Sequence, residues 1–454
     1  MRPAPVRLRG SRATRHVADH AIRHTQNRFD TYYTQPYFET NDCLPIRAHI
    51  RPATSATGPA SGDADEKGTR MTQSIPATKL APTEPAPTEP AQDEPAQDEP
   101  QYPLAPSAVD ASVYTDQARY QGELDRILSH AWFPVFPSAD VPKPRDYVVW
   151  NQLGQSVVII RLDDGSVSAW HNVCQHRGAL LVEGSGRCSN GRFTCPWHGF
   201  VYDLEGSVRQ VPLRESFDPA QLAGLRAPAV RVVEWSGWIW LTLSDTLPDL
   251  LEYLDTIGEE LAGYRLDRFD TRFRVSVTLT ANWKIVVDAF NETWHVPFTH
   301  KSTLSGLVLW RDASLKISSP HSWMTLPIRG FTDKVSNSDH RQTHLCHYLA
   351  FPNTIFSCFP NHLQMWTAWP VAPDKTVLNA YQLVGPTPDG LSDAKWEQHN
   401  ERDWKHFLDV LAEDSEVINN FAALARSKGF RRNIFNTAES RLTAFHDEVA
   451  KRLR

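Results

Sequence analysis

The sequence predicts an α+β protein, in which a small all-β domain is followed by a larger domain of strands and helices. Residues 147–245 consist of short β-rich runs separated by turn residues. Residues 246–454 combine helical patterns with a second group of strand patterns. The chain has 454 residues, 41% of them hydrophobic, which is long enough for two or three domains with their own cores.

The composition excludes several classes of protein. A net charge of -6 gives no general attraction to nucleic acid or to an anionic membrane surface. We find neither a run of about 18 apolar residues nor the apolar core of a secretory signal, so a soluble, cytoplasmic protein is expected. Three of the six cysteines lie between Cys174 and Cys195. This crowding favours a metal site in a reduced compartment over a disulfide framework.

The first 111 residues carry no core-forming pattern. Residues 1–70 are rich in Arg and His and are expected to be disordered. One explanation for residues 1–70 is that translation begins at Met71. The other is that they form an organelle transit peptide, although their acidic residues argue against this. Residues 71–111 predict a Pro/Glu-rich linker, since residues 81–100 read APTEP APTEP AQDEP AQDEP. Residues 112–146 then predict an N-terminal helical segment.

Two cysteines and two histidines occupy two short motifs inside the all-β domain. The pairs are Cys174-x-His176 and Cys195-x-x-His198. Zinc ribbons generally use two cysteine pairs, whereas each motif here supplies one cysteine and one histidine. That arrangement suits a Rieske [2Fe–2S] cluster, in which one iron takes both cysteines and the other takes both histidines. Zinc is the alternative, and Cys188, which lacks a paired histidine, is interpreted as a hairpin residue.

A second candidate site lies in the stretch NWKIVVDAFNETWHVPFTH, residues 282–300. On one continuous helix Asp288, Glu292 and His295 would share a face at positions i, i+4 and i+7. Pro297 is expected to break this helix and to let His300 turn back toward His295. Buried acids beside histidines are costly unless they bind metal or share protons.

A third ligand is predicted on the C-terminal helix. Two histidines and one carboxylate form the facial triad of non-haem Fe(II) oxygenases. The C-terminal helix carries an apolar stripe of period about 3.5 that consists of Phe407, Leu411, Ile418 and Phe421. Asp414 falls within this stripe, whereas Glu413 and Glu416 are expected to point away from it. A buried salt bridge is the other interpretation of Asp414.

From residue 112 to 454 the sequence resembles the catalytic α subunit of a Rieske non-haem iron oxygenase, also called a ring-hydroxylating dioxygenase. The resemblance implies a helix-grip catalytic domain and a Rieske cluster held by Cys174, His176, Cys195 and His198. It implies mononuclear Fe(II) held by His295, His300 and Asp414, with Glu292 as a bridging acid. It also implies trimers, with or without a small β subunit, in which the cluster of one chain faces the iron of its neighbour. An NAD(P)H-dependent reductase, with or without a ferredoxin, would supply electrons.

Three positions depart from the commonest pattern of that family: Trp294 replaces a usual Tyr, Asp288 a usual Asn, and Glu292 a usual Asp. Glu at the bridge is common among relatives that act as monooxygenases or demethylases. Asp288 is a second candidate catalytic carboxylate, one helical turn before Glu292.

Three functions remain open at this point. The first is hydroxylation of an aromatic or other apolar ring, as in aromatic hydrocarbon catabolism, which an aromatic-rich second domain favours. Its aromatic residues include Phe351, Phe356, Phe359, Trp366 and Trp369. Ordinary sheet packing explains most of these rings. The alternative is a monooxygenase or demethylase acting on a methylamine or a methoxy aromatic. A non-catalytic electron-transfer or zinc protein would leave the second candidate site unexplained.

Overall fold

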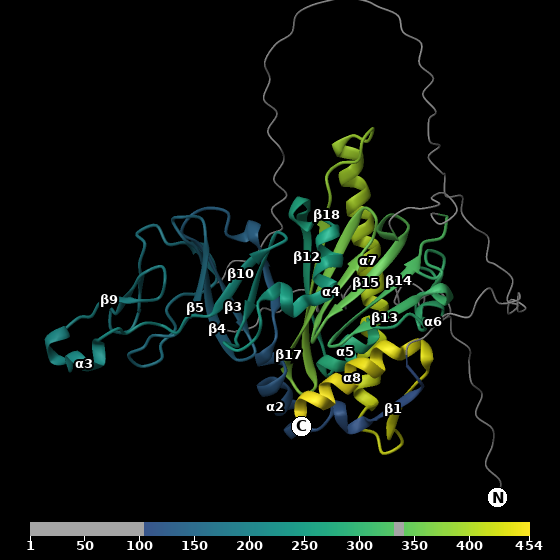
Figure 1. Ribbon diagram of the computed structural model, residues 1–454, viewed down its shortest axis with the longest axis horizontal. Helices are drawn as coiled ribbons and strands as arrows, with labels where there is room; N and C mark the ends of the chain where they lie inside the picture. The colour runs from purple at the N-terminus through teal and green to yellow at the C-terminus, as the bar shows by residue number, and fades with distance from the viewer. Residues whose placement is uncertain (1–103, 331–339) are drawn as a thin grey trace, which may run out of the picture. The chain divides into compact units, whose positions relative to one another are not determined.

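The computed structural model describes residues 104–330 and 340–454. The expected disordered extension, residues 1–70, and residues 71–103 of the expected linker lie outside this part of the chain. No helix within the described ranges is long and apolar enough to cross a membrane. The described residues include the all-β region, a seven-stranded antiparallel sheet and the helices around that sheet, which confirms the predicted α+β class (Figure 1).

The first described elements differ from the sequence expectation. Strand β1 (Ser107–Asp110) lies within the predicted linker range and pairs antiparallel with β19 (Arg432–Phe435). Helix α2 (Gln117–Arg126) begins after Asp116, whose side chain accepts the backbone N–H of Arg119. Strand β2 (Phe133–Pro137) follows in a range that was expected to be helical. Its two prolines are compatible with a strand because β2 lies at the edge of its sheet.

The all-β region contains three small sheets. The strands pair in the orders β5-β4-β3-β6, β10-β11-β2 and β7-β8-β9. Their bounds are β3 (Asp146–Gln152), β4 (Gln155–Arg161), β5 (Val167–His171), β6 (Ser185–Arg187), β7 (Phe193–Thr194), β8 (Val201–Tyr202), β9 (Val208–Gln210), β10 (Arg231–Trp235) and β11 (Trp238–Thr242), with the short helix α3 (Pro219–Leu222). The β-rich patterns predicted for β3, β4, β5, β10 and β11 are confirmed.

The second predicted domain is built on one antiparallel sheet in the order β12-β18-β17-β16-β15-β14-β13. The strands from β13 to β18 form a meander, and β12 joins it beside β18. Their bounds are β12 (Asp270–Leu279), β13 (Ser314–Ser318), β14 (His321–Pro327), β15 (His344–Ala350), β16 (Thr354–Cys358), β17 (His362–Ala372) and β18 (Lys375–Val384).

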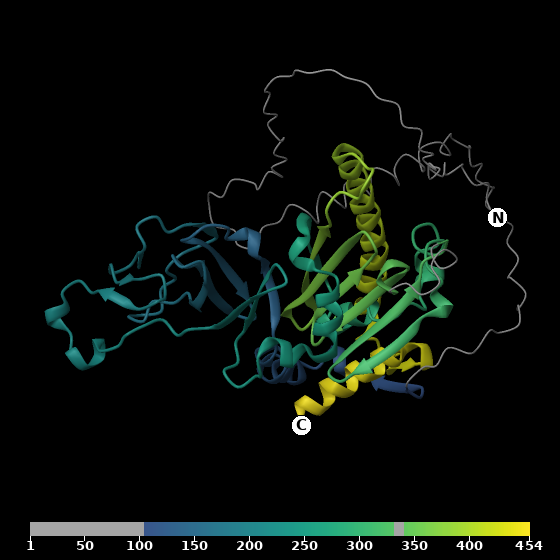
Figure 2. The ribbon, with the colours of Figure 1, turned by 45° about the horizontal axis from the view of Figure 1, so that its top comes forward.

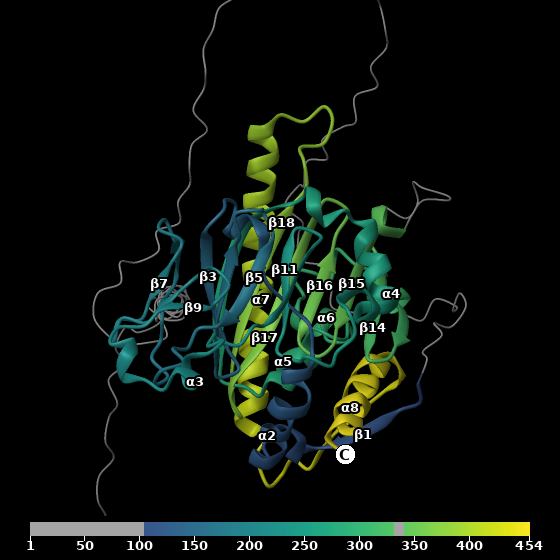
Figure 3. The ribbon, with the colours of Figure 1, turned by 60° about the vertical axis from the view of Figure 1, so that its left-hand side comes forward.

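Alternation of side chains along the strands gives this sheet two faces. On the face that we call the inner face, Trp366 packs against Phe407 of α7 (Asp393–Leu424), with ring centroids 5.8 Å apart. On the outer face, Tyr348 meets Tyr264, which ends α4 (Leu250–Gly263). Figure 2 shows α7 running along the sheet, and Figure 3 shows α4 beside β14 and β15. The inner face therefore lies beneath the long helix that carries Asp414.

The helix expected to run from residue 282 to His295 is shorter than predicted. Asn282 caps α5 (Trp283–Ala289), and the helix ends at Ala289. The carboxylate of Glu292 accepts the backbone N–H groups of Trp294 and His295, and such local capping competes with a continuing helix. Pro297 lies in the first turn of the next helix, α6 (Val296–Thr299), so it starts a helix instead of ending one.

A buried ion pair joins α5 to α2. The Lys284 ammonium lies 2.5 Å from Oε2 of Glu123, and both side chains are fully buried. Trp283 Nε1 and Arg119 Nε also donate to the Glu123 carboxylate, at 2.9 and 3.2 Å. Burial lowers the pKa of Lys284 to about 8, with Glu123 opposing the shift, so the lysine remains charged at neutral pH.

Lys284→Met should therefore lower the free energy of unfolding on the order of 3 kcal/mol, because it leaves a buried carboxylate without its main partner. Chemical denaturation followed by tryptophan fluorescence measures the change. The double variant Lys284→Met/Glu123→Leu is the matched control, and it should recover most of the loss because no buried charge is left over. A denaturation midpoint in Lys284→Met equal to that of the wild type would contradict the expectation.

Candidate metal centres

The two cysteine–histidine motifs form two loops with the same backbone pattern. In each loop the cysteine N–H donates to the carbonyl oxygen five residues later, and a glycine N–H donates back to the cysteine carbonyl. These glycines, Gly178 and Gly199, have φ values of 76° and 72°, which L-residues rarely adopt. The chain therefore turns tightly after Cys174 and again after Cys195.

The side chains of these loops are arranged at two depths. The thiols belong to the core of the all-β region, since Cys174 and Cys195 are 3% and 2% exposed. The rings of His176 and His198 are half-buried, with centroids 4.7 Å apart. The Tyr202 hydroxyl donates to Sγ of Cys174 at 3.3 Å, a contact that the sequence did not predict. Two deep sulfurs and two shallower imidazoles are a donor set that could hold a [2Fe–2S] cluster.

Cys188 is in a different environment. It follows β6, and its thiol donates to the carbonyl oxygen of Arg192 at 3.3 Å. Burial raises the pKa of this thiol, so it stays protonated and is a poor metal ligand.

We therefore expect Cys195→Ser to abolish the EPR signal of the reduced Rieske cluster, whereas Cys188→Ser should leave it intact. EPR spectra of the dithionite-reduced proteins provide the measurement. The two variants are matched because each replaces one buried thiol in the same core. An intact signal in Cys195→Ser would overturn the proposed ligand set.

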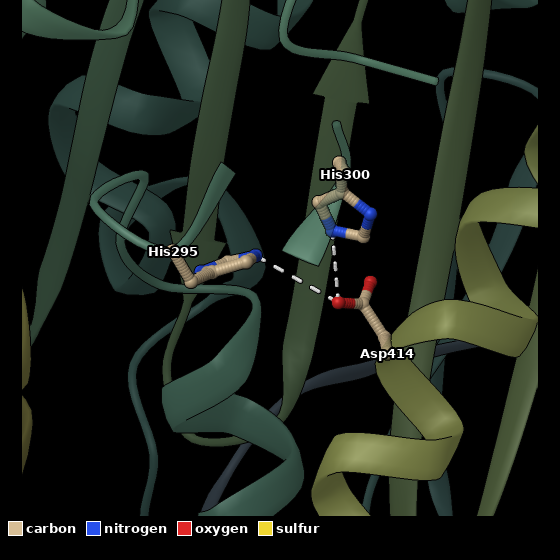
Figure 4. Close-up of side chains that lie close together, drawn as sticks. All are labelled: His295, His300 and Asp414. Atoms are coloured by element: carbon tan, nitrogen blue, oxygen red, sulfur yellow. Dashed lines mark ion pairs between the residues drawn. The ribbon is translucent and has the colours of Figure 1, made fainter. Parts of the chain in front are cut away.

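The second site combines three side chains from two segments (Figure 4). His295 immediately precedes α6, His300 immediately follows it, and Asp414 lies in the middle of α7. Oδ1 of Asp414 lies 3.0 Å from Nε2 of His300 and 3.7 Å from Nε2 of His295. One ligand atom from each residue lies within 4.8 Å of the others, so the group could hold a metal ion.

Two glutamates hold the outer nitrogens of these histidines. Glu292 contacts Nδ1 of His295, and Glu413 lies 2.7 Å from Nδ1 of His300. Nδ1–H groups that donate to these carboxylates leave Nε2 of each ring, on the side of Asp414, as the nitrogen that can bind a metal once its proton is lost. The expectation that Glu413 points away from the site is wrong. Glu413 is the neighbour of Asp414 in the sequence, and its carboxylate contacts His300 and Thr303.

The charge of this site favours a cation. Burial alone would lower the pKa of His295, but Glu292 and Asp414 outweigh it and raise that pKa to about 9. For His300, burial is outweighed by Asp414 and then by Glu413, which raise its pKa. Three carboxylates thus surround two imidazoles within a largely buried space.

Asp288 belongs to another network. It accepts a hydrogen bond from the Tyr114 hydroxyl at 2.7 Å and lies 3.0 Å from Nε2 of His446 on helix α8 (Ser440–Leu453). The expectation that it shares a helical face with Glu292 and His295 is wrong, because α5 ends before Glu292. Asp288 ties α5 to the N-terminal segment and to α8.

Comparison with known families identifies both regions. Residues 131–228 match the family model "Rieske [2Fe-2S] domain", and residues 266–454 match "Ring hydroxylating alpha subunit (catalytic domain)". The chain belongs to the Rieske non-haem iron oxygenases, as a catalytic α subunit. Its cofactors are therefore a Rieske [2Fe–2S] cluster and a mononuclear non-haem iron, and both donor sets described above fit those groups.

Curated relatives of this Rieske oxygenase carry names of three related activities. The chain is 27% identical over 210 residues to the glycine betaine monooxygenase oxygenase subunit of Chromohalobacter salexigens, covering 46% of each chain. It is 32% identical over 195 residues to the carnitine monooxygenase oxygenase subunit of Acinetobacter baumannii, covering 41% of this chain and 51% of the relative. It is 31% identical over 198 residues to chloroplastic choline monooxygenase of Amaranthus tricolor, covering 41% and 43%. The chain thus spans about half the length of the curated relatives it matches.

Two solved structures share the fold. One is a quaternary ammonium Rieske monooxygenase described in terms of carnitine oxidation and inter-subunit electron transfer, with a TM-score of 0.65 and 20% identity, covering 76% of this chain and 95% of that one. The other is naphthalene 1,2-dioxygenase from Rhodococcus sp. bound to indole, with a TM-score of 0.62 and 18% identity, covering 76% and 94%. At these identities the likeness concerns the fold alone.

Proposed function

We propose that the chain is the terminal oxygenase of a multicomponent monooxygenase whose substrate is a methylammonium compound. The observation that carries this proposal is the similarity to relatives named for glycine betaine, carnitine and choline, which are all trimethylammonium compounds. These names support the alternative expectation from the sequence better than aromatic hydrocarbon catabolism. Glu292, an acid common in monooxygenases and demethylases of the family, agrees with it.

Seven side chains hold the two cofactors in this proposal. The cluster is bound by Cys174, His176, Cys195 and His198, and the mononuclear iron by His295, His300 and Asp414. Bound iron supplies oxygen activation, and the cluster supplies electrons. Glu292 and Glu413 hold the two imidazoles in the ligating tautomer.

The overall reaction is hydroxylation of a carbon next to the ammonium nitrogen. It consumes one O2, two electrons and two protons, and it releases one water. The C–H bond becomes C–OH, and the resulting hemiaminal breaks its C–N bond to give a tertiary amine, an aldehyde and a proton. The aromatic rings of Phe290, Trp366 and Phe407 pack together on the inner face, and their faces suit a cationic methylammonium group.

The partners in this proposal are a reductase and further copies of the chain. An NAD(P)H-dependent reductase, with or without a ferredoxin, supplies electrons to the cluster. Large apolar side chains are exposed on both sides of the proposed contact between copies: Trp197 and Leu213 beside the cluster loops, and Trp294 and Phe298 beside His295. Burying them between copies, as in a homotrimer, removes apolar area from water and brings the cluster near Glu292.

The test is product analysis with a reconstituted electron-transfer chain. Glycine betaine, carnitine and choline are compared with naphthalene and a methoxy aromatic at equal concentration. We expect NAD(P)H-dependent O2 consumption coupled to product formation from at least one trimethylammonium compound. The products should be an aldehyde and a tertiary amine, or the hydroxylated intermediate that precedes them. Coupled oxidation of the aromatic compounds alone would refute the proposal and restore ring hydroxylation, the second candidate, which the aromatic inner face also accommodates.

A further inference from the structure

Arg441 of α8 is a buried guanidinium that forms no ion pair with a carboxylate in residues 104–330 or 340–454. Its side chain is 1% exposed. Nε donates to Oγ of Ser322 at 3.1 Å, and Nη2 donates to the Ser322 carbonyl at 3.4 Å. Nη1 has no hydrogen-bond partner among the described residues. Burial lowers the pKa of Arg441 to about 9, which still leaves the side chain charged at neutral pH.

The other buried cations of the described chain are paired. Lys284 contacts Glu123 at 2.5 Å, and Arg161 contacts Glu234 at 2.6 Å. A buried charge is costly unless an opposite charge or several hydrogen bonds compensate for it. Arg441 departs from this pattern, because no carboxylate among the described residues balances its charge.

Three more buried polar atoms near Arg441 have no partner among the described residues: Oδ1 of Asn291, Nδ1 of His347 and Nε1 of Trp366. Asn291 donates through Nδ2 to the Arg441 carbonyl at 3.4 Å. The rings of His347 and Trp366 lie 5.5 Å apart. Buried polar groups in native proteins usually have a partner, and a ligand or an ordered water can supply one, so these four atoms are candidates for such a contact.

Strand register places these groups on the inner face. Ser322 lies two residues before Met324, which pairs with His347, so both face the same side. His347 pairs with Ser357, and Ser357 pairs with Gln364, two residues before Trp366. The anchor of Arg441 and the two unpartnered rings therefore share the face that α7 covers.

This region adjoins the proposed iron site. Asn291 immediately precedes Glu292, and His347 interacts electrostatically with both Arg441 and the proposed ligand His295. His347 is thus close enough to the guanidinium and to His295 for both charges to act on its pKa. Trp366, its ring neighbour, packs against Phe290 with centroids 4.6 Å apart. Cationic and aromatic groups are therefore juxtaposed beside one reaction centre.

We propose that Arg441 forms an anion-binding subsite beside the proposed iron site, and that the substrate is a methylammonium carboxylate whose carboxylate accepts a hydrogen bond from Nη1 of Arg441. This inference rests on the proposed function and narrows it. The carboxylate completes the hydrogen bonding of the guanidinium, and the methylammonium group lies against the aromatic rings nearer the iron. An amino alcohol such as choline leaves the guanidinium unpaired and binds less well.

Calorimetric titration of the oxidised holoenzyme with four probes tests this inference without turnover. Glycine betaine and choline share a trimethylammonium group, but glycine betaine carries a carboxylate where choline carries an alcohol. Their carbon isosteres, 3,3-dimethylbutanoate and 3,3-dimethylbutanol, lack the positive charge. We expect glycine betaine to bind about 10- to 100-fold more tightly than choline, as a charge-assisted hydrogen bond implies.

Variants then assign the preference to Arg441. Arg441→Met should reduce the preference for glycine betaine over choline to about 3-fold or less. Arg441→Lys keeps the positive charge and folds more readily than Arg441→Met, and it should retain only part of the preference. Arg452→Met is the matched control, since Arg452 lies on the same helix and pairs with Glu448. It should leave all four affinities unchanged.

The four probes separate failure of this inference from failure of the proposed function. Equal binding of glycine betaine and choline, both tighter than their isosteres, would refute the anion subsite and leave the methylammonium function standing. Binding of 3,3-dimethylbutanoate as tight as that of glycine betaine, and lost in Arg441→Met, would support the subsite and refute the methylammonium function. A preference unchanged in both Arg441 variants would refute Arg441 as its source.

Discussion

Glu292→Gln should lower steady-state turnover by about 100-fold while both metal centres stay occupied. The Glu292 carboxylate contacts Nδ1 of His295 and is partly exposed. In the proposed trimer, a histidine of a neighbouring cluster would reach it there. Glutamine keeps the shape of the side chain but removes the charge that orients the imidazole and links it to the neighbour. Stopped-flow oxidation of the pre-reduced Rieske cluster should slow in parallel with turnover.

Two matched variants sharpen this prediction. Glu413→Gln removes the equivalent carboxylate from His300 and should weaken iron binding without slowing cluster oxidation in the molecules that retain iron. Asp288→Asn alters the network with Tyr114 and should lower stability more than turnover per iron. Wild-type turnover in Glu292→Gln, together with an inactive Asp288→Asn, would show that the bridging carboxylate is Asp288.

Asp414→Ala should lower the iron content by about one atom per chain and abolish turnover, because a facial triad without its carboxylate keeps only two neutral ligands. The Rieske EPR signal should remain, since the proposed cluster ligands lie in the separate all-β region. Metal analysis and EPR on the same sample measure both quantities. Glu416→Ala, which changes an exposed acid on the same helix, should retain full iron. Full iron occupancy in Asp414→Ala would make Glu413 the next candidate ligand.

The parts of the site that could be predicted from sequence are those encoded locally. The two cysteine–histidine motifs are short loops, so spacing alone predicts their proximity. His295 and His300 flank one short helix, and Asp414 stands out because it interrupts an apolar stripe. The structure places the last three together, and their role as iron ligands stays a proposal.

The parts that could not be predicted depend on contacts between distant segments. Strand β1 becomes a strand through pairing with β19, which lies more than 300 residues later. Helix α5 ends at Ala289, and Glu292 then caps the backbone N–H groups of Trp294 and His295, neither of which helical periodicity reveals. Arg441 resembles any helical arginine until the sheet buries it beside Ser322 and His347. Contacts of this kind also select a substrate, so the sequence alone could not decide between ring hydroxylation and the proposed methylammonium substrate.

Single turnover of the pre-reduced holoenzyme with glycine betaine and O2, in the absence of a reductase, tests the central claim most directly. One electron from the cluster and one from the mononuclear iron suffice for one hydroxylation. We expect loss of the reduced Rieske spectrum together with about one N,N-dimethylglycine and one formaldehyde per mononuclear iron. Oxidation of the cluster with no amine product, from glycine betaine or from carnitine and choline in parallel samples, would contradict the account.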